Sequence, residues 1–70
     1  MKVKDLIELA SSGCRIALIE KVSEKMFADE LFIANRNSKV WDFYSNREVS
    51  YFGPAEREDC ELFITIKEAR

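Results

Sequence analysis

The hydrophobic residues of this chain follow a helical period near the start and an alternating period from Cys14 onward. Within residues 3–10, apolar side chains recur at the i, i+3, i+4, i+7 spacing that forms one stripe on an α-helix, and Leu9 widens that stripe. Gly13 follows two serines and is expected to end the helix in a left-handed conformation. A helix followed by strands around one core predicts an α+β domain.

Three segments alternate in the way that half-buried strands do. They are residues 14–21, residues 49–52 and residues 61–67, and the last has the clearest alternation. Between the first two lies a segment, residues 22–34, that fits either a helix or a strand, since no Gly or Pro interrupts it. For that segment we favour a hairpin that turns near Ser23-Glu24, followed by a second strand through Met26, Phe27, Leu31, Phe32 and Ile33.

A second, short helix is expected between the second and third strands. Asn37 or Ser38 is suited to cap it, and Asn46 to close it. The predicted order is α-β-β-α-β-β, which gives one small α+β domain, residues 1–70. Its antiparallel sheet of about four strands is packed by the N-terminal helix.

The length and charge of the chain limit the class of protein. Seventy residues fit one domain with a thin core, and 47% hydrophobic with 34% charged residues is typical of a folded chain. The formal net charge of −2 argues against a protein that binds nucleic acid by bulk positive charge. No signal peptide and no apolar run of membrane-spanning length are found, so we expect a cytoplasmic protein without a membrane partner.

The residue types present give catalysis no support. The chain has no histidine, the commonest general base and metal ligand, and its two cysteines cannot complete a zinc site. We expect Cys14 and Cys60 to be free thiols in a reducing compartment, the alternative being a bridge between them in a secreted domain. No enzyme activity, cofactor or metal is predicted.

An acidic loop is expected between the last two strands, where four carboxylates surround Arg57. Such a cluster offers oxygen ligands to a divalent cation, but it lacks the alternating Asp/Asn and the turn glycine of a dedicated calcium loop. A solvated connection is the favoured interpretation. The acidic residues are Glu56, Glu58, Asp59 and Glu61.

The most suggestive feature for function is a segment rich in aromatic residues. Five of the eight aromatics lie within residues 41–52, with cations beside them. Core packing is the simplest interpretation, and a protein-binding hot spot or a single-stranded nucleic-acid platform are the alternatives. The predicted protein-contact residues are Trp41, Tyr44, Arg47, Tyr51, Phe52 and Phe63. The nucleic-acid alternative uses the cations Arg36, Lys39 and Arg47.

Strict alternation places Phe52 and Phe63 on the face of the sheet opposite Val49 and Ile64. One of the two faces then needs a cover, which is either a helix or another subunit. The second of these covers gives the hypothesis of a homodimer through Phe63, alongside a protein partner of unknown identity.

Three patches of sequence resemble a loose group of short, mostly uncharacterised proteins from phages and mobile elements of Gram-positive bacteria. The patches are the opening MKVKDLIEL (residues 1–9), REVSYF (residues 47–52) and LFITI (residues 62–66). The resemblance implies an accessory or host-interaction role and supplies no catalytic residue. Together with the composition, it predicts a non-enzymatic protein that acts through protein–protein interaction, with a nucleic-acid or nucleotide binder as the alternative.

Overall fold

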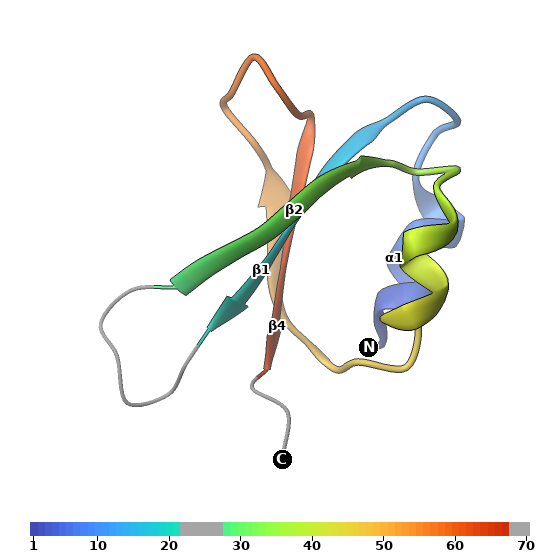
Figure 1. The fold of residues 1–70 in the computed structure, drawn as a ribbon, viewed down its shortest axis with the longest axis vertical. Helices are drawn as coiled ribbons and strands as arrows, with labels where there is room; N and C mark the ends of the chain where they lie inside the picture. Colours follow the sequence, from blue (N-terminus) through green and yellow to red (C-terminus); the bar gives the residue numbers. More distant parts are fainter. Residues whose placement is uncertain (22–27, 68–70) are drawn as a thin grey trace.

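A single four-stranded sheet organises the protein in the computed structural model, which describes residues 1–21 and 28–67 (Figure 1). The sheet has the strand order β2-β1-β4-β3. The expected α+β class is confirmed. The elements in chain order are α1 (Val3–Leu9), β1 (Arg15–Lys21), β2 (Ala28–Asn35), the 3-10 helix η1 (Lys39–Phe43), β3 (Val49–Pro54) and β4 (Leu62–Lys67).

The sheet is mixed, whereas the sequence predicted an antiparallel one. β1 pairs with β2 and β3 pairs with β4 in antiparallel fashion, but the central strands β1 and β4 run parallel. The chain passes through β2, η1 and β3 before β4 returns beside β1, which supplies the long connection that a parallel pair requires. The alternation within a strand predicts which side chains share a face of the sheet. It does not indicate which strand lies next to it or in which direction that strand runs, so the parallel pairing of β1 with β4 was missed.

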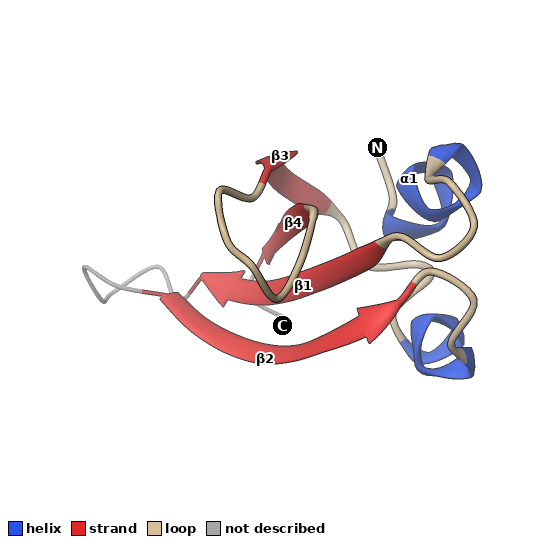
Figure 2. Ribbon diagram, turned by 90° about the horizontal axis from the view of Figure 1, so that it is seen from above, coloured by secondary structure: helices blue, strands red, loops and turns tan. Residues whose placement is uncertain are grey.

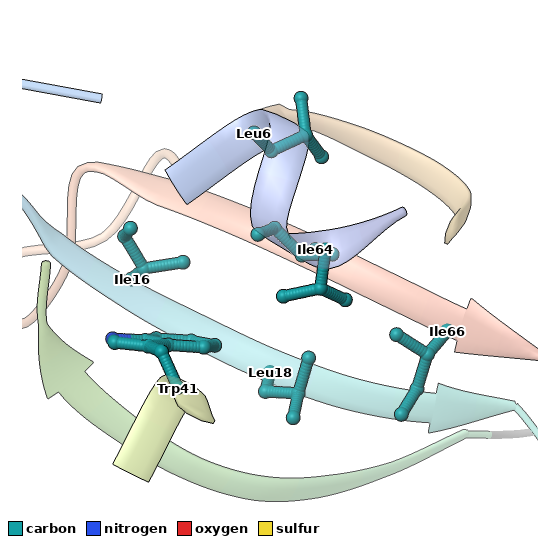
Figure 3. Packing of buried hydrophobic residues seen from close by; sticks show 7 residues of the cluster. Leu6, Ile16, Leu18, Trp41, Ile64 and Ile66 are labelled. Carbon is teal, nitrogen blue, oxygen red and sulfur yellow. The ribbon is translucent and has the colours of Figure 1, made fainter. Parts of the chain in front are cut away.

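The core lies between one face of the sheet and the two helices. Figure 2 shows both helices at the same end of the molecule, and Figure 3 shows apolar side chains of the central strands meeting Leu6 and the ring of Trp41. No helix in the described part of the chain is long and apolar enough to cross a bilayer. The buried cluster consists of Val3, Leu6, Ile16, Leu18, Trp41, Ile64 and Ile66.

The strand interpretation of the ambiguous segment is confirmed where the structure describes it. β2 covers residues 28–35, so the later part of the segment is a strand rather than a helix. The predicted turn at Ser23-Glu24, together with Met26 and Phe27, lies outside the described residues. β2 continues the sheet beyond β1 and forms one of its two edges.

The short helix is present, with the predicted cap and an earlier end. The side-chain oxygen of Ser38 accepts a hydrogen bond from the backbone N–H of Val40 at 3.3 Å, as an N-cap does. The helix is of the 3-10 type and ends at Phe43, before the expected Asn46. A 3-10 segment is normally limited to a few residues, which accounts for the early end.

A register shift in β3 changes which face its aromatic residues occupy. Val49 pairs with Ile66 and Tyr51 with Thr65, so Ser50 has no counterpart on β4. An extra residue of this kind is a β-bulge, and it inverts the alternation beyond it. Phe52 therefore lies opposite Ile64 and shares its face, contrary to the prediction.

Phe63 lies on the other face of the sheet, which we call the outer face, as predicted from the alternation of β4. The connection from β3 to β4 crosses this face. Its residue Arg57 forms an ion pair with Glu30 on β2, the strand at the opposite edge of the sheet. The connection packs beside Ile19 and Phe63, whose side chains both point to the outer face. The acidic loop, residues 56–61, thus covers part of the face that the helices leave open.

Candidate binding surface

The six predicted contact residues do not form one surface. Trp41 is only 3% exposed, and its ring centroid lies 5.1 Å from that of Phe32. The indole Nε1–H donates to the backbone oxygen of Asn35 at 2.9 Å. Tyr44 is half-buried and packs on the same Phe32 ring at 5.4 Å. Trp41 and Tyr44 therefore serve the core and its margin, which was the simplest of the interpretations offered by the sequence.

Two of the three cations of the nucleic-acid alternative are held by internal contacts. The guanidinium of Arg47 donates to the Glu20 carboxylate and to the backbone oxygen of Lys67, both at 2.7 Å. Arg36 donates from Nε to two carbonyl oxygens at the end of α1, those of Ile7 at 2.8 Å and Ala10 at 3.1 Å. Both carbonyls lie at the helix end, where acceptors are available to donors from other parts of the chain, and the Ile7 oxygen also accepts from the N–H of Ala10 at 3.3 Å.

Lys39, the third cation of that set, is exposed at the first position of η1. Its two companions fix the ends of secondary-structure elements to one another. The cations are therefore divided between structural contacts and solvent, and they do not make a continuous line of phosphate-binding charge.

Tyr51 and Phe63 meet on the outer face. Their ring centroids are 5.6 Å apart, and Tyr51 is 63% exposed. Gly53 lies opposite Phe63 in the register, and the Phe63 ring covers it closely enough that a Cβ at Gly53 would be in ordinary contact with the ring, at 3.5 Å. The pair forms a small aromatic patch at the β3 side of the outer face.

A hollow lies at the opposite face, between the C-terminal end of α1 and strands β3 and β4. Its volume is about 470 Å³. Leu9 and Phe52 are among its lining residues and are 78% and 45% exposed. We call this feature the α1–β3 hollow; it is lined by Leu6, Leu9, Ala10, Ser11, Cys14, Phe52, Gly53, Pro54, Glu61 and Leu62.

The exposure of Leu9 departs from the expected helical stripe. Periodicity placed it at the edge of the apolar face, but α1 ends at Leu9, and its side chain lines the hollow with 78% of its surface exposed. Its neighbours Leu6 and Phe52 line the same hollow. Leu9 is the surface residue that the sequence reasoning missed, and an apolar side chain on the last helical turn was the available signal.

In the part of the chain that the structure describes, β3 is an edge strand of the sheet, and its free edge borders this hollow. Ala55 donates its N–H to the oxygen of Glu61 at 3.0 Å, which shows which residues of β3 are hydrogen-bonded to β4. Along an antiparallel pair, every second residue has its N–H and C=O directed to the neighbouring strand. Counting back from Ala55, these residues are Gly53 and Tyr51. The N–H and C=O of Phe52 consequently point away from the sheet, toward the open edge.

Both cysteines are free thiols, as predicted. Cys14 is half-buried at the wall of the α1–β3 hollow, and burial raises the pKa of its thiol, with the nearby Glu61 carboxylate adding to the effect and Arg15 opposing it. Burial likewise raises the pKa of the Cys60 thiol. A raised pKa keeps each group in the thiol form, which is a poor nucleophile.

Two of the four carboxylates of the acidic loop are paired with arginines. Asp59 accepts from Arg57 at 2.7 Å, and Glu61 lies 2.8 Å from the guanidinium of Arg15 on β1. Each partner lowers the pKa of the carboxyl group it bonds. Among the residues that the structure describes, no three metal-ligating side chains come together in a group. These contacts fasten the loop to β1 and β2.

Comparison of the chain with protein-family models, with curated proteins and with solved structures finds no match. Three surface features of the described chain bear on its function. They are the α1–β3 hollow, the free edge of β3 and the aromatic patch of Tyr51 and Phe63.

Proposed function

We propose that this chain is a non-enzymatic binding protein that contacts another protein through the α1–β3 hollow. The observation that carries the proposal is the exposure of two large apolar side chains, Leu9 and Phe52, which both line the mainly apolar α1–β3 hollow. Covering a side chain of this size stabilises a contact by roughly 1.5–3 kcal/mol. Large apolar groups gathered around a hollow are typical of the centre of a protein interface.

The internal contacts of Arg36 and Arg47 favour this function over nucleic-acid binding, since single-strand binders use free cations along the backbone path. The net charge of −2 favours it as well. We place the protein in the cytoplasm, in keeping with its two free thiols, and the resemblance to short phage and mobile-element proteins adds an accessory role.

A photo-crosslinking amino acid at position 9 tests the proposal. The variant Leu9→p-benzoylphenylalanine is irradiated in cells that naturally produce the protein, with Glu58→p-benzoylphenylalanine as the control, because Glu58 is exposed on the acidic loop. We expect one recurrent protein adduct from position 9 and none from position 58. Equal adducts from both positions, or no adduct, would contradict the proposal.

The same adducts separate the other hypotheses. An adduct of twice the monomer mass identifies the homodimer predicted from the sequence. An adduct removed by nuclease supports the nucleic-acid alternative and overturns the protein-binding proposal. Native mass spectrometry of the purified protein gives an independent measure of subunit number and of any retained oligonucleotide.

A further inference from the structure

We propose that the α1–β3 hollow receives an extended peptide segment of the partner, which adds to the sheet as a new strand on the free edge of β3. This inference rests on the proposed function and specifies the kind of partner. It follows from three features of the same place: unpaired backbone groups, the direction of the Phe52 side chain, and the short length of the open edge.

The backbone of Phe52 is suited to pair with a strand. Its N–H and C=O both point to the open edge, as the phase of the β3–β4 ladder requires. One residue that presents a donor and an acceptor on the same side can exchange two hydrogen bonds with one residue of an extended chain. Main-chain pairing of this kind provides affinity in β-strand addition, and pockets for alternate side chains provide specificity.

The side chain of the added residue would enter the hollow. Residues directly opposite one another in antiparallel strands point to the same face of the sheet. Phe52 points to the face that carries α1, where it lines the hollow with Leu6 and Leu9. A peptide residue paired with Phe52 therefore directs its side chain into an apolar space of about 470 Å³, a volume within the usual range for ligand pockets.

The open part of the edge is short, which indicates a peptide rather than a second folded copy. Val49 donates its N–H to the oxygen of Met1 at 2.9 Å, and Lys2 bridges to Glu48, so the chain's own start occupies the edge before Ser50. Pro54 has no N–H to offer at the other end. Among the residues that the structure describes, the edge is thus open only between Ser50 and Pro54, a length that suits one short extended segment.

Synthetic peptides provide the test. The probe is an acetylated peptide of about seven residues, with Thr and Val alternating around a central Leu, a length and composition typical of strands. It is titrated into ¹⁵N-labelled protein while the Phe52 amide signal is followed. We expect saturable binding with the largest shift at Phe52. Replacing the central Leu by Asp, or methylating its backbone nitrogen, should weaken binding by about ten-fold or more.

Two protein variants locate the contact. Leu9→Glu places a charge at the hollow and should lower the affinity for the leucine-centred peptide by about ten-fold. The matched control is Leu31→Glu, the same substitution at an exposed leucine on the other edge strand β2, and it should leave the affinity unchanged. Equal weakening by both variants, or absence of binding up to about 1 mM peptide, would overturn the strand-addition inference.

The peptide result and the crosslinking result can fail separately. A protein adduct at position 9 without peptide binding leaves the proposed function standing and refutes the extended peptide as its partner. Peptide binding that shifts the β2 amides, with Phe52 unchanged, refutes the assigned edge. Absence of both the adduct and the peptide contact refutes the two proposals together.

Discussion

Trp41 shows how a single residue joins the parts of this small core. Its ring fills the space between η1 and the sheet, while its Nε1–H satisfies the backbone oxygen of Asn35 at the end of β2. The same residue type in an aromatic-rich segment is also typical of a binding hot spot. Composition cannot separate these roles, because both place Trp beside Tyr and Arg, and only the packing of Trp41 on Phe32 distinguishes them.

The substitution Trp41→Phe is expected to lower the free energy of unfolding by about 1–3 kcal/mol. It removes part of the buried ring and one of the two hydrogen bonds that the Asn35 carbonyl accepts, the other being donated by the N–H of Ser38 at 2.9 Å. Urea denaturation followed by circular dichroism measures the change. The control Phe43→Leu, at an exposed position of the same short helix, should stay within about 0.5 kcal/mol of the parent. A Trp41→Phe variant as stable as that control would contradict the core role.

At the scale of elements, the acidic loop covers part of the outer face and is held there by ion pairs. Arg57 pairs with Glu30 on β2 and with Asp59 in the loop, and Cys60 beside it is buried. The sequence predicted a solvated connection, and the carboxylates are indeed exposed. The partners from outside the loop, Glu30 and Arg15, were not predictable, because they approach the loop only through the order of strands in the sheet.

Removing the ion pairs of the acidic loop should expose Cys60. In a Cys14→Ala background, Arg57→Ala is expected to speed the reaction of Cys60 with Ellman's reagent several-fold, since it removes the ion pairs that hold the loop. Exposure also relieves the burial that raises the pKa of this thiol. The control is Glu58→Ala in the same loop. Identical reaction rates in the two variants would show that Arg57 does not hold the loop closed.

The limits of prediction from the sequence are clearest in β3. Periodicity located this strand, the N-terminal helix and the terminal strand, because each pattern is a local property of the chain. It placed Phe52 on the wrong face because the bulge at Ser50 depends on pairing with β4. The α1–β3 hollow was missed for the same reason, since Leu9 and Phe52 line it together only after the helix and the sheet have packed.

For the whole molecule, acid should destabilise the fold. The pKa values of Asp59 and Glu61 are lowered in the folded state by Arg57 and Arg15. A group whose folded pKa is depressed stabilises the fold above its unfolded pKa, and this contribution is lost as the pH falls through the folded value. The urea midpoint is therefore expected to fall as the pH is lowered below about 4.5, the ordinary range of a carboxyl group.

The variant Glu61→Gln isolates one of these contributions. It cannot titrate and should show a smaller fall in the urea midpoint between neutral and acidic pH than the parent protein. Glu58→Gln, in the same exposed loop, serves as the matched control and should follow the parent. A Glu61→Gln profile that is the same as the parent profile would contradict a role for this carboxyl group in the acid response.

The parallel pairing of β1 with β4 has a consequence for synthesis on the ribosome. β1 is made early, yet one of its two neighbours in the sheet is β4, the last strand that the structure describes. A nascent chain that lacks residues 62–67 also lacks Ile64 and Ile66, and so cannot assemble the buried cluster. Folding of this domain is therefore completed only after translation has passed β4, and until then the apolar face of β1 is available to chaperones.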